Sequence, residues 1–227
     1  MPTAFWIVTR DYVAEAAASA SSVARTMPEM RRCLFSPDEV RCEAFHEIHQ
    51  LTARTSDRWY VDCSRYVVEA LEAIKDSNLL YLDSDTYFLS PASELFDLLE
   101  NWDLAAAHAP GRSTAPTVSK IPDCFPEFNI GVIVMNNSPI VRSLWQKTYS
   151  NLLSRPDVYG NNDQAPFREA LWHDRSIRVT TLPPEYNCRF IFGTFVTGKV
   201  KVLHGRGNYE IVGKSLNAQC GMRTWQP

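Results

Sequence analysis

Short apolar runs alternate with amphipathic segments along the chain. Phe5–Val8 is an apolar run with β-branched members, and the segment Val13–Ala24 after it is rich in alanine and serine. The first pattern is typical of a buried strand, and the second favours a helix. From Tyr60 to Ile74 apolar residues recur at intervals of three and four, which predicts a helix with one face on a sheet. Strand, turn and helix in this order predict an α/β fold that begins with a βαβ unit.

The same pattern continues to the end of the chain. Further strands are predicted at Arg31–Phe35, Val40–Ile48, Leu79–Leu82, Leu104–Ala107, Phe128–Met135, Ile177–Leu182 and Val200–Leu203. Further helices are predicted at Pro91–Leu99, Pro139–Leu153 and Ala165–Trp172. The segment Pro110–Pro126 is rich in Pro, Ser, Thr and Gly, and is long enough to be either disordered or a functional flap. The tail from Asn208 to Pro227 shows no clear period.

Two carboxylates interrupt the sequence where one buried strand ends. Leu79–Leu82 is followed directly by Asp83-Ser84-Asp85. Two anions this close repel each other and are costly to desolvate beside a core. A hard divalent cation bound by oxygens would neutralise them, at the strand end where open α/β sheets bind ligands. The alternative is a turn whose two carboxylates point into water, because aspartate is common at such corners. The triplet alone leaves both interpretations open.

Composition narrows the classes of function. With 227 residues, 45% hydrophobic and 22% charged, the chain is sized and composed like one globular domain. A net charge of -3 and the lack of a Lys/Arg run give no electrostatic footprint for nucleic acid. No apolar run approaches the roughly 20 residues that span a bilayer, and the first residues lack the layout of a signal peptide.

The spacing of the cysteines indicates the redox environment of the protein. None of the six forms a C-x-x-C or has a histidine at zinc-ligand spacing. Their even number permits disulfides, but scattered cysteines in a chain of this size are more often buried thiols. We therefore expect reduced cysteines and a cytoplasmic protein. The six are Cys33, Cys42, Cys63, Cys124, Cys188 and Cys220.

Six short motifs lie at the ends of predicted elements between Phe5 and about Tyr209. They are Thr9-Arg10-Asp11-Tyr12, Ser64-Arg65, Leu80-Tyr81-Leu82-Asp83-Ser84-Asp85, Phe128-Asn129-Ile130-Gly131-Val132 with Met135-Asn136, Asn162-Asp163-Gln164, and Leu203-His204-Gly205. In this order they resemble glycosyltransferases of the GT-A fold. The resemblance is greatest to family 8, which includes glycogenin and bacterial lipopolysaccharide sugar transferases. It implies a single GT-A domain over residues 1–227, with a mixed, mainly parallel sheet flanked by helices.

The resemblance also implies a role for each motif. Asp83, Asp85 and His204 would bind Mn²⁺, with Mg²⁺ as a substitute, because carboxylates and imidazole suit these ions. Asp163 and Gln164 would be the catalytic residues beside the reacting carbon. The implied donor-binding residues are Thr9, Asp11, Tyr12, Arg65, Asp83, Ser84, Asp85, Asn129, Gly131, Gly205 and Arg206.

Five of these residues also have a structural interpretation. His204 would otherwise be a core histidine at a strand end, and Asp163 a helix N-cap with Gln164 on the surface. Tyr12 would pack at the start of a helix, and Arg65 would be a solvated arginine on an amphipathic helix. The sequence alone leaves these alternatives open.

One position departs from the family's pattern. The late motif of the family runs from a histidine to a glycine three residues on and a lysine three further. Gly207 fits, but Glu210 stands where the lysine would support the donor diphosphate. Either Arg206 or Lys201 would supply the positive charge instead, or the donor would be held differently.

The expected activity is metal-dependent transfer of a sugar from a nucleotide-diphosphate donor, a UDP-sugar, to a carbohydrate or glycoconjugate acceptor. The resemblance implies retention of configuration. Acceptor contacts are expected at Pro110–Pro126 and after Tyr209. One alternative is a sugar nucleotidyltransferase, but Thr9–Ala24 has none of the glycines of that class's first loop. The other is a non-catalytic domain that binds nucleotide sugars or carbohydrates.

Overall fold

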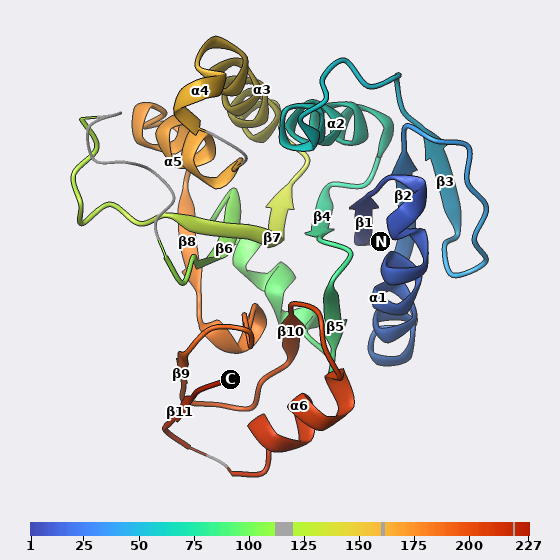
Figure 1. Cartoon of the computed structure of the whole chain (residues 1–227), viewed down its shortest axis with the longest axis vertical. Coiled ribbons are helices and arrows are strands. Elements are labelled where there is room, and N and C mark those ends of the chain that lie inside the picture. The colour runs from blue at the N-terminus through green and yellow to red at the C-terminus, as the bar shows by residue number, and fades with distance from the viewer. Residues whose placement is uncertain (112–119, 160–161, 220) are drawn as a thin grey trace.

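A seven-stranded sheet forms the centre of the structure, a computed structural model that describes residues 1–111, 120–159, 162–219 and 221–227 (Figure 1). The strand order is β3-β2-β1-β4-β7-β6-β8. Only β7 runs antiparallel to its neighbours, which are β4 and β6. The mixed, mainly parallel sheet expected from the sequence is therefore confirmed. Its strands are β1 Thr3–Ile7, β2 Arg31–Ser36, β3 Glu47–Gln50, β4 Asn78–Leu82, β6 Leu104–His108, β7 Phe128–Asn136 and β8 Val179–Leu182.

Helices cover both faces of this sheet, and each face has its own apolar core. Alternate residues of a strand point to opposite faces. Phe5 of β1 therefore packs with residues of α2, α3 and α5, whereas Trp6 packs with residues of α1 and η2. The α-helices are α1 Val13–Thr26, α2 Trp59–Ala73, α3 Pro139–Ser154, α4 Pro156–Tyr159, α5 Gln164–His173 and α6 Tyr209–Leu216. The 3-10 helices are η1 Arg10–Tyr12, η2 Ser93–Glu100 and η3 Pro184–Tyr186.

Two small antiparallel sheets complete the described structure. β5 Thr86–Phe88 pairs with β10 Val202–His204, and β9 Thr194–Val196 pairs with β11 Arg223–Trp225. In the first pair Thr86 lies opposite His204. This pairing brings a late segment of the chain beside the end of β4, as the position of β10 next to β5 shows in Figure 1.

Two serines of α1 hold β5 in place. The buried Ser19 side chain accepts from Trp6 Nε1 at 3.0 Å and lies 2.8 Å from Thr86 Oγ1. Ser22 Oγ accepts from the backbone N–H of Phe88 at 2.9 Å. Buried polar groups of this kind need partners, because an unpaired donor or acceptor costs about 1–3 kcal/mol. The serines of the alanine-rich helix therefore serve to anchor the short strand that follows Asp85.

Most elements predicted from the sequence are confirmed within a few residues, but one predicted strand is wrong and the tail contains elements for which no prediction was made. The predicted strand Val40–Ile48 is a loop for most of its length, and β3 begins only at Glu47. The apolar loop residues up to Phe45 instead pack over the core on the α1 side of the sheet. The tail from Asn208 contains α6 and β11, which pack their apolar residues against the cluster around Cys188.

The remaining expectations concern the flap, the membrane and the cysteines. The middle of the proposed flap Pro110–Pro126, residues 112–119, lies outside the described residues, so the flap stays a prediction. Across the described part of the chain, no helix combines the length and apolar character needed to cross a bilayer. Five cysteines, Cys33, Cys42, Cys63, Cys124 and Cys188, are free thiols, and Cys220 lies outside the described residues.

Candidate functional site

Asp83, Asp85 and His204 meet at the carboxyl end of β4. His204 Nε2 lies 3.5 Å from Asp83 Oδ2 and 3.2 Å from Asp85 Oδ1. One ligand atom from each residue can be chosen so that all three lie within 4.8 Å of one another. The backbone fixes this arrangement, because Gly205 N–H donates to the carbonyl of Asp85 at 2.9 Å. The three residues that the sequence singled out as metal ligands are thus neighbours in space.

The imidazole of His204 is held in one orientation. Its Nδ1 lies 2.8 Å from Asn187 Oδ1, and Asn187 Nδ2 donates to Asn129 Oδ1 at 2.8 Å. Since the amide nitrogen of Asn187 is used by Asn129, its oxygen accepts from Nδ1–H, which leaves Nε2 facing the two carboxylates. A second residue that fixes the tautomer in this way is typical of metal-binding histidines. The residues present therefore fit a divalent cation.

Asp83 and Asp85 favour a positive charge at Nε2 of His204. Burial by itself lowers the pKa of His204, but its hydrogen bonds to Asp83 and Asp85 outweigh burial and raise the pKa overall. For Asp85, burial raises the pKa, but His204 and then the charges of Arg189 and Arg206 lower it below its usual value. Either a proton on His204 or a bound metal ion would supply the positive charge that stabilises the two carboxylates.

Gly131 of β7 makes room for the cluster. A Cβ atom at this position would collide with His204 Cε1 and would lie 2.5 Å from Asp83 Oδ2. The carbonyl of Gly131 accepts from the backbone N–H of Asp83 at 2.9 Å, so β7 runs directly beneath the site. A residue with a side chain there would force the ligands apart, which explains the glycine within an otherwise apolar strand.

Asn129, Asp163 and Gln164 form the neighbouring part of the site. Asn129 Nδ2 donates to Gln164 Oε1 at 2.9 Å, and Asn129 Oδ1 accepts from the backbone N–H of Gly131 at 3.3 Å. Asp163 stands at the N-cap of α5, but its side chain makes no capping bond there. Asn162 Oδ1 accepts from the backbone N–H of Gln164 instead, at 2.7 Å. The carboxyl of Asp163 is therefore not used as a helix cap.

The carboxyl of Asp163 has a perturbed pKa. Burial among protein atoms, followed by the negative charge of Asp83, raises the pKa of Asp163 to about 7. A small part of its surface still reaches solvent. A shifted carboxyl beside a cluster of ionisable groups is typical of functional sites.

A second group of predicted residues lies on the α1 side of the Asp-x-Asp turn. Arg206 donates to Glu15 Oε1 at 2.7 Å and Oε2 at 3.1 Å, and its guanidinium lies 5.4 Å from the centre of the Tyr12 ring. Ser84 Oγ donates to the same Glu15 at 2.5 Å. The Tyr12 side chain is 46% exposed. Thr9 and Asp11 lie in the adjoining turn, where the carbonyl of Thr9 accepts from the backbone N–H of Tyr12.

Arg65 and Lys201 have other partners. The guanidinium of Arg65 donates to Asp62 at 2.9 Å and to Glu69 at 2.8 Å, both on its own helix, and also contacts Thr52 and the carbonyl of Ala53. Contacts within the protein thus account for the position of the Arg65 guanidinium, and its role in binding a donor stays a prediction. Lys201 Nζ forms an ion pair with Glu94.

Two residues of the site were missed by the sequence analysis, Asn187 and Arg189. Arg189 Nη1 lies 2.8 Å from His204 Nε2. Between the two, Cys188 forms an isolated parallel bridge with Leu203, and its carbonyl accepts from the backbone N–H of His204. In such an extended segment residues 187 and 189 point to the same side. The only signal in the sequence was this alternation of polar and apolar residues.

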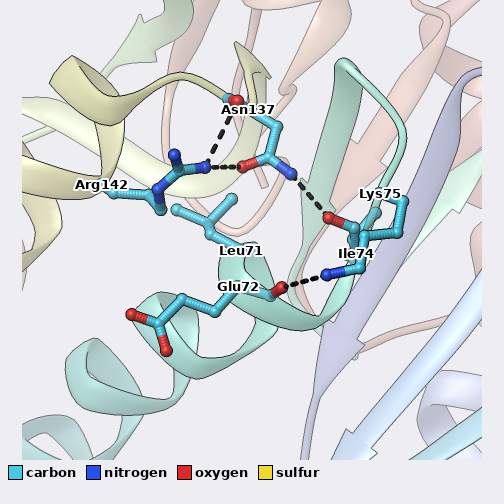
Figure 2. Close-up of a pocket in the computed structure, with 6 residues that line it drawn as sticks. All are labelled: Leu71, Glu72, Ile74, Lys75, Asn137 and Arg142. Atoms are coloured by element: carbon cyan, nitrogen blue, oxygen red, sulfur yellow. Dashed lines mark hydrogen bonds between the residues drawn. The ribbon is translucent and has the colours of Figure 1, made fainter.

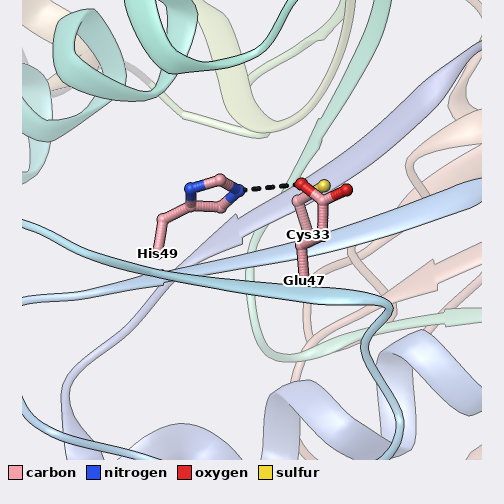
Figure 3. Close-up of side chains that lie close together, drawn as sticks. All are labelled: Cys33, Glu47 and His49. Carbon is pink, nitrogen blue, oxygen red and sulfur yellow. Dashed lines mark hydrogen bonds and ion pairs between the residues drawn. The ribbon is translucent and has the colours of Figure 1, made fainter.

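A second cluster of ligand-type residues has a different explanation. Cys33 lies beside Glu47 and His49 at the edge of the sheet (Figure 3). Both oxygens of Glu47 are occupied, one by Arg31 and the other by His49 Nε2 at 3.1 Å. Burial raises the pKa of the Cys33 thiol to about 11. The cluster is therefore an ion pair beside a protonated thiol.

A polar hollow lies near the other end of β4. It is lined by residues where α2 ends and α3 begins (Figure 2). Its polar groups bond to one another, as when Asn137 Nδ2 donates to the carbonyl of Ile74 and Arg142 donates to Asn137 Oδ1, both at 2.8 Å. Because α2 leads into the amino end of β4, this hollow lies away from Asp83.

No protein-family model matches the sequence, and no curated protein matches it. Solved structures are similar. The galactosyltransferase LgtC, solved in complex with donor and acceptor sugar analogues, superposes with a TM-score of 0.66 and 17% identity over 91% of this chain and 87% of LgtC. The chain has the GT-A glycosyltransferase fold.

Two other structures share this GT-A fold. The glycosyltransferase GlyE of Streptococcus pneumoniae TIGR4 superposes with a TM-score of 0.61 and 17% identity over 83% of this chain. The chain spans only 46% of the length of GlyE. An active-site mutant of LgtC, with glutamate in place of a glutamine, gives a TM-score of 0.62 and 16% identity over 92% of this chain and 88% of that protein.

The glycine beneath the cluster provides the first test. We expect Gly131→Ala to weaken Mn²⁺-dependent binding of UDP at least about tenfold and to reduce the free energy of unfolding by about 1–3 kcal/mol, because the added methyl overpacks the site. Calorimetry and thermal unfolding measure the two effects. Gly198→Ala is the matched control, since a Cβ there would meet nothing closer than 3.9 Å. Unchanged binding in Gly131→Ala would contradict the geometry.

The carboxyl of Asp163 provides a second test, in protein without metal. Its pKa is about 7 in the folded protein, against about 4 for an unperturbed aspartate, so the folded state binds the extra proton between these values. The free energy of unfolding of the wild type should therefore fall as pH rises from about 4 to 7, relative to that of Asp163→Asn.

Urea unfolding at pH 4.5 and pH 7.5 measures this difference. After allowance for partial exposure of the carboxyl, the stability advantage of Asp163→Asn should grow by about 1–3 kcal/mol between the two pH values. Asp97→Asn, at an exposed position, controls for the loss of one charge. An advantage that is the same at both pH values would show that Asp163 does not titrate in this range.

Proposed function

We propose that this chain is a metal-dependent glycosyltransferase that moves a sugar from a UDP-sugar to a carbohydrate or glycoconjugate acceptor, with retention of configuration. The observation that carries the proposal is the meeting of Asp83, Asp85 and His204 at the carboxyl edge of a GT-A sheet. Ligands of open α/β sheets bind at this edge. LgtC and GlyE, which share the fold, are glycosyltransferases, and this supports the proposal.

Asp83, Asp85 and His204 are the residues that would hold the metal, Mn²⁺ or Mg²⁺. When bound, the ion supplies Lewis-acid stabilisation of the charge that develops on the leaving diphosphate. Asn187 keeps Nε2 of His204 turned toward the carboxylates, and Gly131 allows β7 to pass beneath them. The protein thus arranges the ligands before the donor arrives, which lowers the reorganisation needed in the reaction.

The nucleotide would lie along the turn after β1. Thr9, Asp11 and Tyr12 offer polar groups and an exposed aromatic ring to the base, as the resemblance implies. Ser84 and Gly205 flank the carboxylates, and Gly205 has a φ of +130° that favours glycine. Arg206 adds positive charge at the same turn, although it already pairs with Glu15. Arg65 would reach the donor only by exchanging a bond with Asp62 or Glu69.

Asn129, Asp163 and Gln164 would face the donor sugar. Because Gln164 Oε1 already accepts from Asn129, the amide NH₂ of Gln164 is the group left to donate to a sugar oxygen. The active site of LgtC also includes a glutamine, the one replaced in its mutant. Asp163, with its raised pKa, can hold or accept a proton near neutral pH. We assign these two residues the catalytic positions.

The metal carboxylates provide the test of this function. We expect Asp83→Asn and Asp85→Asn to fold as the wild type does and to lose Mn²⁺-dependent binding of UDP by about tenfold or more, since each removes a charged ligand. Release of UDP from a panel of UDP-sugars with Mn²⁺ should fall by a similar or larger factor. Calorimetry measures the binding, and a coupled assay measures the release.

Asp97→Asn again serves as the control for loss of a carboxylate. Binding of UDP that is independent of Mn²⁺ and unchanged in both variants would contradict the proposal. Tight binding of UDP-sugars by the wild type without release of UDP in the presence of any acceptor would instead indicate a binding domain.

A further inference from the structure

Arg189 places a guanidinium against the metal-facing nitrogen of His204. Its Nη1 lies 2.8 Å from His204 Nε2. A guanidinium has only N–H donors, so Nε2 must offer its lone pair to this contact. The same lone pair is the one that a metal held by Asp83 and Asp85 would use. Arg189 and the metal therefore compete for a single atom.

The charge of Arg189 is not matched by an ion pair within the described residues. No carboxylate oxygen of the described ranges lies within 4.0 Å of its nitrogens. Its Nε is buried and, among the same residues, has no hydrogen-bond partner. The guanidinium also lies 5.6 Å from the centre of the Phe192 ring, which supports its plane from one side. A partly buried cation with unused donors is well suited to an incoming anion.

The other nearby cations are already paired. Arg206 donates twice to Glu15, and Lys201 forms an ion pair with Glu94. Glu210 stands where the family pattern has the lysine that supports the diphosphate. Of these three cations only Arg189 combines a contact with His204 and the absence of an ion-pair partner among the described residues. The planar guanidinium of arginine also presents a rigid fork of donors that matches two phosphate oxygens, whereas the lysine ammonium is a compact point charge.

We propose that Arg189 binds the diphosphate of the donor in place of the missing lysine, and that metal binding at Asp83, Asp85 and His204 releases Arg189 from His204 for this task. The inference rests on the proposed function, because it assumes a nucleoside-diphosphate donor. Its consequence is an order of events: Nε2 of His204 would first be engaged by the metal, and the freed guanidinium of Arg189 would then complete the diphosphate site.

Two binding experiments with Arg189→Gln test this proposal, with UDP and UMP as probes. With Mn²⁺ present, calorimetry should show UDP affinity falling about tenfold to a hundredfold, because charge-assisted hydrogen bonds to phosphate are lost. UMP affinity should change less than about threefold. Arg189→Lys should recover part of the UDP affinity. Lys199→Gln, at an exposed position, is the matched control for loss of one positive charge.

The second experiment omits nucleotide and titrates Mn²⁺ while paramagnetic resonance counts the free ion. Mn²⁺ affinity of Arg189→Gln should equal or exceed that of the wild type, because a competitor for Nε2 is removed. Weaker Mn²⁺ binding would overturn the competition, and unchanged UDP affinity would overturn the diphosphate role. If wild-type protein binds UDP no better with Mn²⁺ than without, the proposed function itself fails, and this arm separates the two failures.

Discussion

The antiparallel pairing of β5 with β10 is the interaction on which the site depends. It sets Thr86 opposite His204, so a histidine from the end of the chain stands against the two aspartates that follow β4. The bond from Gly205 N–H to the carbonyl of Asp85 extends the same pairing by one step. Each strand has only three residues, and so short a ribbon is not stable alone. Its stability comes from α1, whose buried Ser19 and Ser22 bond to Thr86 and Phe88.

The second constraint on the site is the negative charge gathered at Asp83, Asp85 and Asp163. Burial and then the negative charge of Asp83 raise the pKa of Asp163, whereas Asp83 and Asp85 together outweigh the effect of burial and raise the pKa of His204. A cluster with this much negative charge, partly removed from water, is unfavourable until a cation binds. In the described structure the guanidinium of Arg189 supplies part of that positive charge. A divalent ion would supply it more fully, which would link the stability of the site to its ligand.

Elements and residues marked by a local pattern or a short motif could be predicted from the sequence. The apolar runs located six of the seven strands of the main sheet, and the motifs located Asp83, Asp85 and His204. Prediction failed where contacts join distant three-residue segments, since β5 and β9 are too short to show a period. Asn187 and Arg189 were missed for this reason, because their role comes from the bridge between Cys188 and Leu203. The strand expected at Val40–Ile48 was wrong because its apolar residues cover the core as a loop.

The central claim is that His204 is a metal ligand and not only a core residue. His204 is fully buried and bonded to Asn187, so burial alone does not separate the two roles. Thermal unfolding of wild type and His204→Ala, each with and without Mn²⁺ and UDP, does separate them, because a ligand that binds only the folded state raises its melting temperature. The account predicts that the variant loses most of the Mn²⁺/UDP-induced rise, with only a modest change in the ligand-free melting temperature. A variant that melts much lower without ligand yet keeps the wild-type rise would contradict it.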